Sequence, residues 1–477
     1  MKKVFLLALC LSVITNLTAA SLRLPHMLSN HMVLQQNTQA RIWGWNDPGK
    51  KVTVTTSWDQ RQRSVATDAQ GNWQVMLPTP RANFTPQVIT VTDGTSKLTL
   101  SDVLIGEVWV CAGQSNMEMP MRGFWGCPVE GYNEEVVKSS QFSTIRSCKL
   151  PSLMRAKPQA DAQCQWKLIG PSTVADVSAV GYYFAKTLTQ ALNIPIGLIE
   201  ANKGGSRIES WLDEDNLKKY THEPTDSATI ANSGWVDYMR PLLWGNATFH
   251  PILNYTVGGI IFYQGCSNVG APAGHYTHLM QVLVDQWRRD FGNADLPFYF
   301  VEIAPFWHNN SSATWAADLR AQQLQAAHTI KHSGIVGTND LVYPDELKQV
   351  HPRQKRQVGQ RLAYLALHND YGLSSLMCQC PEATSASLKG DTCILKLRYT
   401  YDGIMPQSGM QGFELQDAAG KWHKADAWRI DDSTIAVKSN SVTSPAAVSY
   451  CYRNFQLGNV HNQGSLPLMP FNLKLAR

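Results

Sequence analysis

Residues 106–121, GEVWVCAGQSNMEMPM, contain the strand and the loop that decide the fold of this chain. An apolar run ends abruptly in Gly113-Gln114-Ser115-Asn116. This break is typical of a buried strand that ends at the carboxyl edge of a parallel sheet, where open α/β sheets bind their ligands. By itself, a Gly-x-Ser after a strand is more often a turn or a helix cap than a nucleophile. The role of Ser115 therefore depends on the residues at the ends of the other strands.

Residues 102–372 alternate short apolar strands with amphipathic helices. Apolar side chains recur at helical spacing, for example at Leu279, Leu283 and Trp287, and a later helix is expected to start at Pro352. This alternation predicts an α/β fold with a parallel sheet, in which residues 122–167 form an irregular insertion without an assigned element. The strand candidates are VLIGEVWVCA, IPIGLIEAN, VGGIIFY, PFYFVEIAP and SGIVGTND.

Both flanks of the α/β region are rich in strand-forming residues and turns. Residues 21–101 predict a small β-sandwich-like domain, and residues 373–477 predict a second β-rich segment. Residues 1–20 carry two lysines, an apolar segment and a small Ala-Ala pair, which predicts a cleaved signal peptide. We therefore expect an exported protein, either periplasmic or secreted.

Charge and cysteine content argue against several classes of protein. The formal charge of +5 becomes +3 without Lys2 and Lys3, and the remaining basic residues are dispersed, so nucleic acid is not an expected partner. No later apolar run is long enough to span a bilayer. Of ten cysteines, Cys10 lies in the leader, and the odd remainder leaves at least one thiol unpaired. No metal-site spacing appears, so neither a metal nor another cofactor is expected, and the oligomeric state is not predicted.

Polar residues follow the predicted strands at the same edge of the sheet. Ser115 follows the first strand, Gly204-Gly205 the second and Asn268 the third, and the loop after the fifth strand ends at His351. Acyl transfer needs a nucleophile, a base and donors for the oxyanion. His351 would take the proton of Ser115. The oxyanion would be held by the Ser115 N–H, an amide of the Gly204-Gly205 turn and the Asn268 carboxamide.

These same blocks resemble the SGNH (GDSL-like) hydrolases, and within them the sialate O-acetylesterase group. GEVWVCAGQSNMEMPM is similar to the serine block of that group, ANKGGSRIESW to its Gly-Gly block, GGIIFYQGCSN to its third block and VHPRQKRQVGQRLA to its histidine block. The resemblance covers nearly the whole mature chain. It implies a three-layer α/β catalytic domain, no metal, hydrolysis of acetyl esters on sugars including sialic acids, and the same roles for Ser115, His351 and the oxyanion donors.

One departure from the family pattern concerns the acid that orients the histidine. Many SGNH enzymes carry Asp three residues before the histidine, where this chain has Lys348. Asp345 is the acid that we assign to this role, while Glu346 and Asp340 lie nearby. A backbone carbonyl could hold the His351 ring instead, which would leave a Ser-His dyad.

Substrate contacts are expected from Gln114, Arg207 and Gln264. Arg207 could bind a sugar carboxylate through its guanidinium, or it could form a salt bridge to Glu209. Cys266 stands where the group usually has glutamate, and a small thiol could simply pack there. The expected substrate is an O-acetylated sugar, foremost an O-acetylated sialic acid. Another acetylated glycan such as xylan is the alternative, and a non-catalytic glycan-binding protein is a third possibility.

Overall fold

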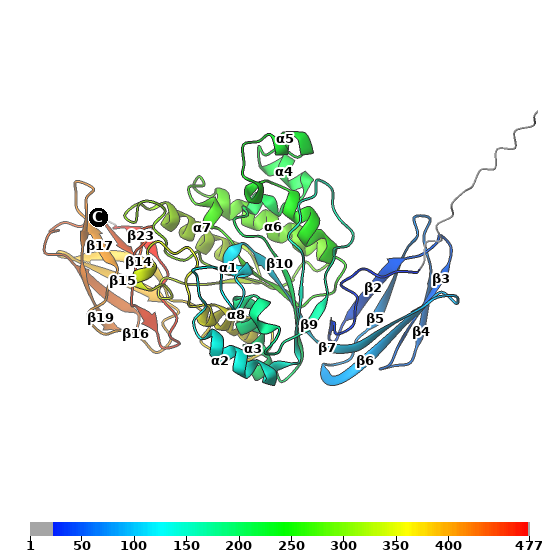
Figure 1. The fold of residues 1–477 in the computed structure, drawn as a ribbon. Helices are drawn as coiled ribbons and strands as arrows, with labels where there is room; N and C mark the ends of the chain where they lie inside the picture. The colour runs from blue at the N-terminus through cyan, green and yellow to red at the C-terminus, as the bar shows by residue number, and fades with distance from the viewer. Residues whose placement is uncertain (1–21, 476–477) are drawn as a thin grey trace, which may run out of the picture.

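The computed structural model describes residues 22–475, and it arranges them as three bodies in a row (Figure 1). A β-rich N-terminal region lies at one end, an α/β unit in the middle and a second β-rich region at the other end. The predicted signal peptide, residues 1–20, lies outside the described residues.

The central unit is built on a sheet with the strand order β13-β12-β11-β7-β10-β8-β9. All neighbours along this path are parallel except β9, which runs antiparallel to β8. The predicted α/β fold with a parallel sheet is therefore confirmed. The strands are β7 (Lys97–Gly113), β8 (Ile145–Lys149), β9 (Trp166–Leu168), β10 (Ile196–Asn202), β11 (Gly259–Tyr263), β12 (Phe298–Val301) and β13 (Ser333–Val336).

Helices cover both faces of this sheet and complete three layers. Alternate residues of β7 point to opposite faces: Val108 and Val110 join the cluster that contains Leu279 of α6, whereas Trp109 and Cys111 join the cluster that contains Phe184 of α3. The helices are α1 (Ser115–Glu118), α2 (Tyr132–Lys138), α3 (Ala179–Leu192), α4 (Glu214–Tyr220), α5 (Ser227–Ala231), α6 (His275–Phe291), α7 (Trp315–Thr329) and α8 (Arg356–Asn369).

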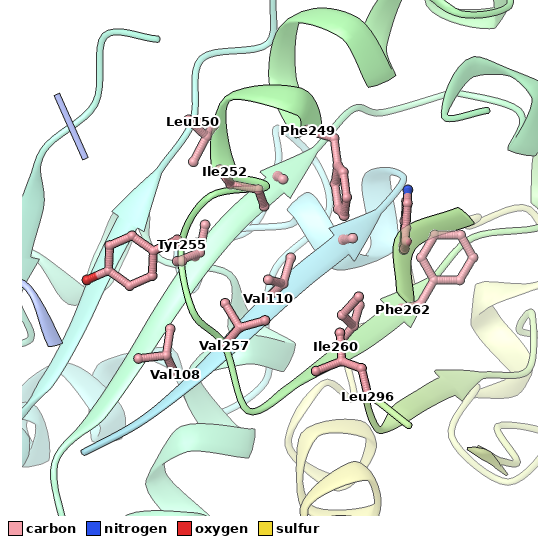
Figure 2. Close-up of a cluster of buried hydrophobic side chains, with 14 of the residues drawn as sticks. Val108, Val110, Leu150, Phe249, Ile252, Tyr255, Val257, Ile260, Phe262 and Leu296 are labelled. Carbon is pink, nitrogen blue, oxygen red and sulfur yellow. The ribbon is translucent and has the colours of Figure 1, made fainter. Parts of the chain in front are cut away.

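Figure 2 shows the core on the α6 side of the sheet. Val108 and Val110 of β7 lie beside Ile260 and Phe262 of β11, and Phe249 closes the cluster from the chain segment before β11. All these side chains are at most 2% exposed. The strands are thus fixed in register by burial on both faces, which holds their carboxyl ends at one edge of the sheet.

Two expectations about local structure are wrong. The stretch 122–167 is not wholly irregular, because it supplies α2 and the strands β8 and β9 of the central sheet. The helix expected at Pro352 begins at Arg356 instead. Residues 352–355 form a loop. In it the Pro352 carbonyl accepts a hydrogen bond from the Lys355 ammonium rather than from a helical amide.

The N-terminal region shares a strand with the central unit. The first part of β7 pairs with β6, and its last part, from Glu107 to Gly113, pairs with β10. The domain boundary predicted after residue 101 thus falls inside one continuous strand. The other N-terminal strands are β1 (Val33–Gln35), β2 (Gln39–Trp45), β3 (Lys51–Thr56), β4 (Gln62–Ala66), β5 (Asn72–Pro78) and β6 (Asn83–Thr92).

The C-terminal region consists of antiparallel sheets that share a core. One sheet has the order β14-β15-β20-β19 and another the order β18-β17-β21-β23, and side chains such as Leu395 and Val448 from the two pack in one cluster. The strands are β14 (Glu382–Lys389), β15 (Thr392–Arg398), β16 (Ile404–Met405), β17 (Phe413–Gln416), β18 (Trp422–Lys424), β19 (Asp426–Asp431), β20 (Thr434–Lys438), β21 (Ala447–Tyr450), β22 (His461–Asn462) and β23 (Phe471–Lys474).

Among residues 22–475, no helix has the length and apolar character needed to cross a membrane. The cysteines of the same range are all free thiols.

Candidate active site

Ser115 is the first residue of the short helix α1, directly after β7. The turn between them requires glycine, because Gly113 has a φ of 137° and a Cβ there would lie 2.3 Å from the Tyr263 carbonyl oxygen. The N–H groups of Met117 and Glu118 donate to the Gln114 carbonyl. Ser115 therefore lies at the start of the helix, where the first backbone N–H groups have no acceptor within the helix itself.

The Gly204-Gly205 turn that follows β10 lies against this serine. A Cβ placed on Gly204 would be 3.4 Å from Ser115 Cβ. The Gly204 N–H already donates to Glu118 Oε2, at 2.6 Å. Gly205 has a φ of 75°, and a Cβ there would lie 2.3 Å from the Tyr238 ring. A Cβ at position 205 would therefore clash with Tyr238.

Asn268 is buried behind the same turn and is tightly hydrogen-bonded. Its Oδ1 accepts bonds from the Ile208 N–H at 3.0 Å and from Gln264 Nε2 at 2.9 Å. Its Nδ2 donates one hydrogen to Glu209 Oε2 at 3.0 Å, and an amide nitrogen carries two hydrogens. The second N–H of the Asn268 amide is therefore not used by this bond.

Gln114 and Gln264 connect the strand-end loops to one another. Gln114 Oε1 accepts the Gly265 N–H at 2.8 Å. Gln264 Oε1 accepts the Tyr276 hydroxyl at 2.7 Å, while its Nε2 also donates to the Ser206 carbonyl at 3.0 Å. Both glutamines are at most 3% exposed. The contacts that the structure gives these two side chains are to the protein, so they hold the loops in place.

His351 is brought to the serine loop by a backbone contact, in which Asn116 Nδ2 donates to the Val350 carbonyl at 3.0 Å. Its Nδ1 faces Cys127 Sγ at 3.9 Å, and its ring lies edge-on to Phe124 with centroids 5.1 Å apart. Its Nε2 is buried without a hydrogen-bond partner, and within residues 22–475 no hydrogen bond joins it to the Ser115 hydroxyl. Nε2 is therefore the ring nitrogen that is free to accept a proton.

Burial is the main cause that lowers the pKa of His351, to about 4, and the nearby charge of Lys355 adds to the effect. Both causes disfavour the charged imidazolium. At neutral pH the ring is therefore neutral, which is the form that a general base requires.

The structure does not bring Asp345 to His351. Its carboxylate is 67% exposed and pairs with Arg353 at 2.8 Å. The other nearby acids are also engaged elsewhere: Glu346 accepts the Tyr343 N–H at 2.9 Å, and Asp340 pairs with Arg361 at 2.6 Å. The contacts of all three carboxylates thus point away from the His351 ring.

Arg207 is buried and paired with acids of the protein. It is 5% exposed and binds Glu223 at 2.5 Å, with Glu209 at 3.7 Å. Its guanidinium also stacks on Trp235, 3.8 Å from the ring centroid. The expected salt bridge to Glu209 is thus present as the longer of two, and the charge of Arg207 is already balanced.

Cys266 lies close to two buried cationic residues, Lys355 and Arg320. Burial raises the pKa of its thiol to about 11, although both cations act in the opposite direction. The thiol is therefore neutral at physiological pH.

Three residues of this site were not predicted from the sequence, because no motif marks them: Glu118, Tyr238 and Lys355.

Comparison with known proteins assigns the chain to a class, the carboxylic ester hydrolases. Residues 105–368, more than half of the chain, match the family described as "Carbohydrate esterase, sialic acid-specific acetylesterase". The chain belongs to this family, and the matched stretch contains Ser115, Gly205, Asn268 and His351. The resemblance found in the sequence is thereby confirmed.

Individual relatives cover nearly the whole chain. The chain is 26% identical to the sialate O-acetylesterase of Mus musculus, over 94% of both proteins. It is 26% identical to that of Homo sapiens, over 94% of this chain and 92% of the human protein. The crystal structure of a carbohydrate acetylesterase from Xanthomonas citri has 30% identity and a TM-score of 0.84, and the match covers 95% of this chain and 99% of that one.

Proposed function

We propose that this protein hydrolyses O-acetyl esters of sialic acids with Ser115 as nucleophile and His351 as base. The observation that carries the proposal is the family match over residues 105–368, which contains both residues. The mammalian sialate O-acetylesterases, which align over 94% of this chain, support the choice of sugar.

In the proposed reaction, neutral His351 removes the proton of the Ser115 hydroxyl through Nε2, and the serine oxygen attacks the acetyl carbon. The tetrahedral intermediate collapses when the imidazolium protonates the sugar oxygen, so that the C–O bond breaks, the sugar leaves with a free hydroxyl and an acetyl-serine remains. Water, deprotonated by the same imidazole, then releases acetate and restores the serine.

Three donors are proposed for the oxyanion: the Ser115 N–H, the Gly205 N–H and the second N–H of Asn268. We favour Gly205 over Gly204 because the Gly204 N–H is already bound to Glu118. Loss of one such donor typically costs about 3 kcal/mol of transition-state stabilisation.

A Ser-His dyad, without Asp345, is the arrangement that the contacts favour. Asp345 is bound to Arg353, and the His351 ring has no carboxylate partner among the described residues.

Export to the periplasm or the medium is part of the proposal. It rests on the signal-like residues 1–20 and is tested by locating the mature protein after cell fractionation.

A second candidate substrate is an acetyl ester on an uncharged glycan such as xylan. The observation that favours it is the pairing of Arg207 with Glu223 and Glu209, because a balanced guanidinium offers little attraction to the carboxylate of a sialic acid. The similar structure from Xanthomonas citri is described as a carbohydrate acetylesterase, with no sugar specified.

The two candidates are separated by acetate release from an O-acetylated sialoside, acetylated xylan and an aryl acetate. We expect the highest kcat/KM on the sialoside, and a preference for xylan would favour the second candidate. Ser115→Ala should abolish all three activities, whereas activity that survives this substitution would refute the nucleophile assignment. Labelling of Ser115 by a fluorophosphonate distinguishes an esterase from a non-catalytic glycan-binding protein, which would not react.

A further inference from the structure

Two buried side chains, Asn116 and Lys355, join the serine loop to the histidine loop. Asn116 follows Ser115 in α1, and Lys355 immediately precedes α8. They are 0% and 1% exposed. Lys355 Nζ donates a hydrogen bond of 2.8 Å to Asn116 Oδ1. The contact therefore connects the two elements that carry the proposed nucleophile and the proposed base.

The same two side chains also hold the backbone on both sides of His351. Asn116 Nδ2 donates to the Val350 carbonyl at 3.0 Å, and Lys355 Nζ donates to the Pro352 carbonyl at 2.6 Å. Because Val350 and Pro352 flank His351, the backbone is held on both sides of this residue, through the Val350 carbonyl before it and the Pro352 carbonyl after it. A side-chain amide and an ammonium thus hold the backbone before and after His351.

Burial of a lysine at this position is energetically unfavourable. Burial lowers the pKa of Lys355 to about 7, against the opposing influence of Glu346, Cys266 and Cys127. Within residues 22–475 no carboxylate forms an ion pair with its ammonium, so neutral oxygens receive its hydrogen bonds. A buried charge without a counter-ion destabilises a fold, and its presence beside a reacting pair suggests a role in the reaction.

We propose that Asn116 and Lys355 are positioning residues that clamp His351 against Ser115 and replace the missing orienting acid. This inference rests on the proposed Ser-His dyad. The clamp acts through the backbone of residues 350–352 rather than through the ring, which leaves Nε2 free. Cys127, at 3.9 Å from Nδ1, is too distant for a strong hydrogen bond and does not substitute for the clamp.

The clamp is tested by steady-state kinetics of Asn116→Ala, Lys355→Met and the double variant on an aryl acetate. Displacement of a reacting group by about 1 Å can cost on the order of 100-fold in rate, so we expect kcat to fall by roughly 10- to 100-fold at little-changed KM. Because the two side chains act as one unit, the double variant should lose no more than the worse single variant. Lys348→Met, in the same loop with its ammonium over Trp307, is the matched control.

If Asn116→Ala, Lys355→Met or the double variant does not fold, the isosteric variant Asn116→Asp still tests the clamp. The aspartate retains an acceptor for Lys355 but lacks the N–H that binds the Val350 carbonyl. A folded Asn116→Asp protein should therefore still lose roughly tenfold in kcat, on the same positional grounds. Wild-type kcat in folded Asn116→Asp and Lys355→Met, or fully additive losses, would overturn the clamp.

An NMR titration of the His351 ring provides a readout that does not depend on ester hydrolysis. Removal of the Lys355 charge should raise the pKa of His351, because a positive neighbour disfavours the imidazolium. The signal is assigned by its disappearance in His351→Gln. If the wild-type protein hydrolyses no acetyl ester but the titration shifts, the proposed function fails, whereas the closeness of Lys355 to His351 that the clamp requires is supported. An unchanged titration would contradict the clamp itself.

Discussion

At His351, burial and a neighbouring charge both favour the neutral ring. The pKa of this histidine is lowered to about 4, from an ordinary value of 6.5. As the proposed general base, His351 works only when deprotonated, so we expect activity above the lowered pKa and its loss as the pH falls through that value. We expect kcat/KM to stay nearly constant from about pH 7 to about pH 5 and to halve near pH 4.

This prediction is checked by a pH profile of kcat/KM on an aryl acetate, with circular dichroism at each pH to show that the protein remains folded. An acidic limb centred near pH 6.5, the ordinary value for histidine, would mean that water reaches the ring and that the site is open rather than buried.

At the level of single residues, the sequence predicted which strand ends carry the polar groups but not how these groups are paired. Ser115, Gly205 and Asn268 gather at one edge because parallel strands end together, and that rule needs no side-chain detail. The pairing of Arg207 with Glu223 depends on the course of the loop between α4 and α5, which contains Glu223. The contact between Asn116 and Lys355 spans 239 positions, and no local pattern encodes it.

At the level of elements, the contact between α3 and α8 depends on a glycine. A Cβ at Gly359 of α8 would lie 2.6 Å from the Val180 carbonyl oxygen and 2.7 Å from Tyr183 Cβ, both in α3. Although alanine is the better helix former by about 1 kcal/mol, Gly359→Ala should destabilise the fold by about 1–3 kcal/mol because the helices must separate.

Chemical denaturation of Gly359→Ala measures this cost, with Gly170→Ala as control because a Cβ at Gly170 meets nothing within 4 Å. Equal stabilities of the two variants would show that α3 and α8 can move apart freely. Since α8 follows directly after the loop of His351, we also expect slower ester hydrolysis by Gly359→Ala.

Helices and strands with a clear pattern of apolar residues could be predicted from the sequence. Those that depend on tertiary contacts could not. Buried strands such as β10 and β11 appear as short apolar runs. β8 contains Arg146, Ser147 and Lys149, and this polar sequence hides a strand that is buried by its neighbours. Proline at position 352 is compatible with a first helical turn, but its carbonyl accepts the Lys355 ammonium and the helix begins only at Arg356.

At the level of the whole molecule, the C-terminal region holds the loop that contains Trp307 and Asn310, which contacts the segment before His351. Asn454 is fully buried, accepts the Ala316 N–H at 2.9 Å and donates to the Asn310 carbonyl at 2.9 Å. The same loop contacts the histidine segment, where the Trp307 N–H donates to the Leu347 carbonyl at 3.2 Å. A loop of the C-terminal region therefore holds, from outside the α/β unit, the loop that contacts the segment before His351.

We expect Asn454→Ala to destabilise the protein by about 2 kcal/mol, because it leaves the buried Ala316 N–H without an acceptor. Thermal unfolding measures the loss, and Asn472→Ala, at an exposed position of β23, should have little effect. A wild-type melting temperature for Asn454→Ala would show that the two regions are held together by other contacts.

The strand β7 runs without a break from Lys97 to Gly113 and ends two residues before Ser115. One end of this strand belongs to the N-terminal sheet and the other to the central sheet. The N-terminal region is thus not a detachable appendage. Melting of its sheet would release the amino end of the strand that presents the serine, so the two regions should unfold as one cooperative unit. Proteolytic removal of residues 22–96 should consequently inactivate the enzyme although every residue of the site is retained.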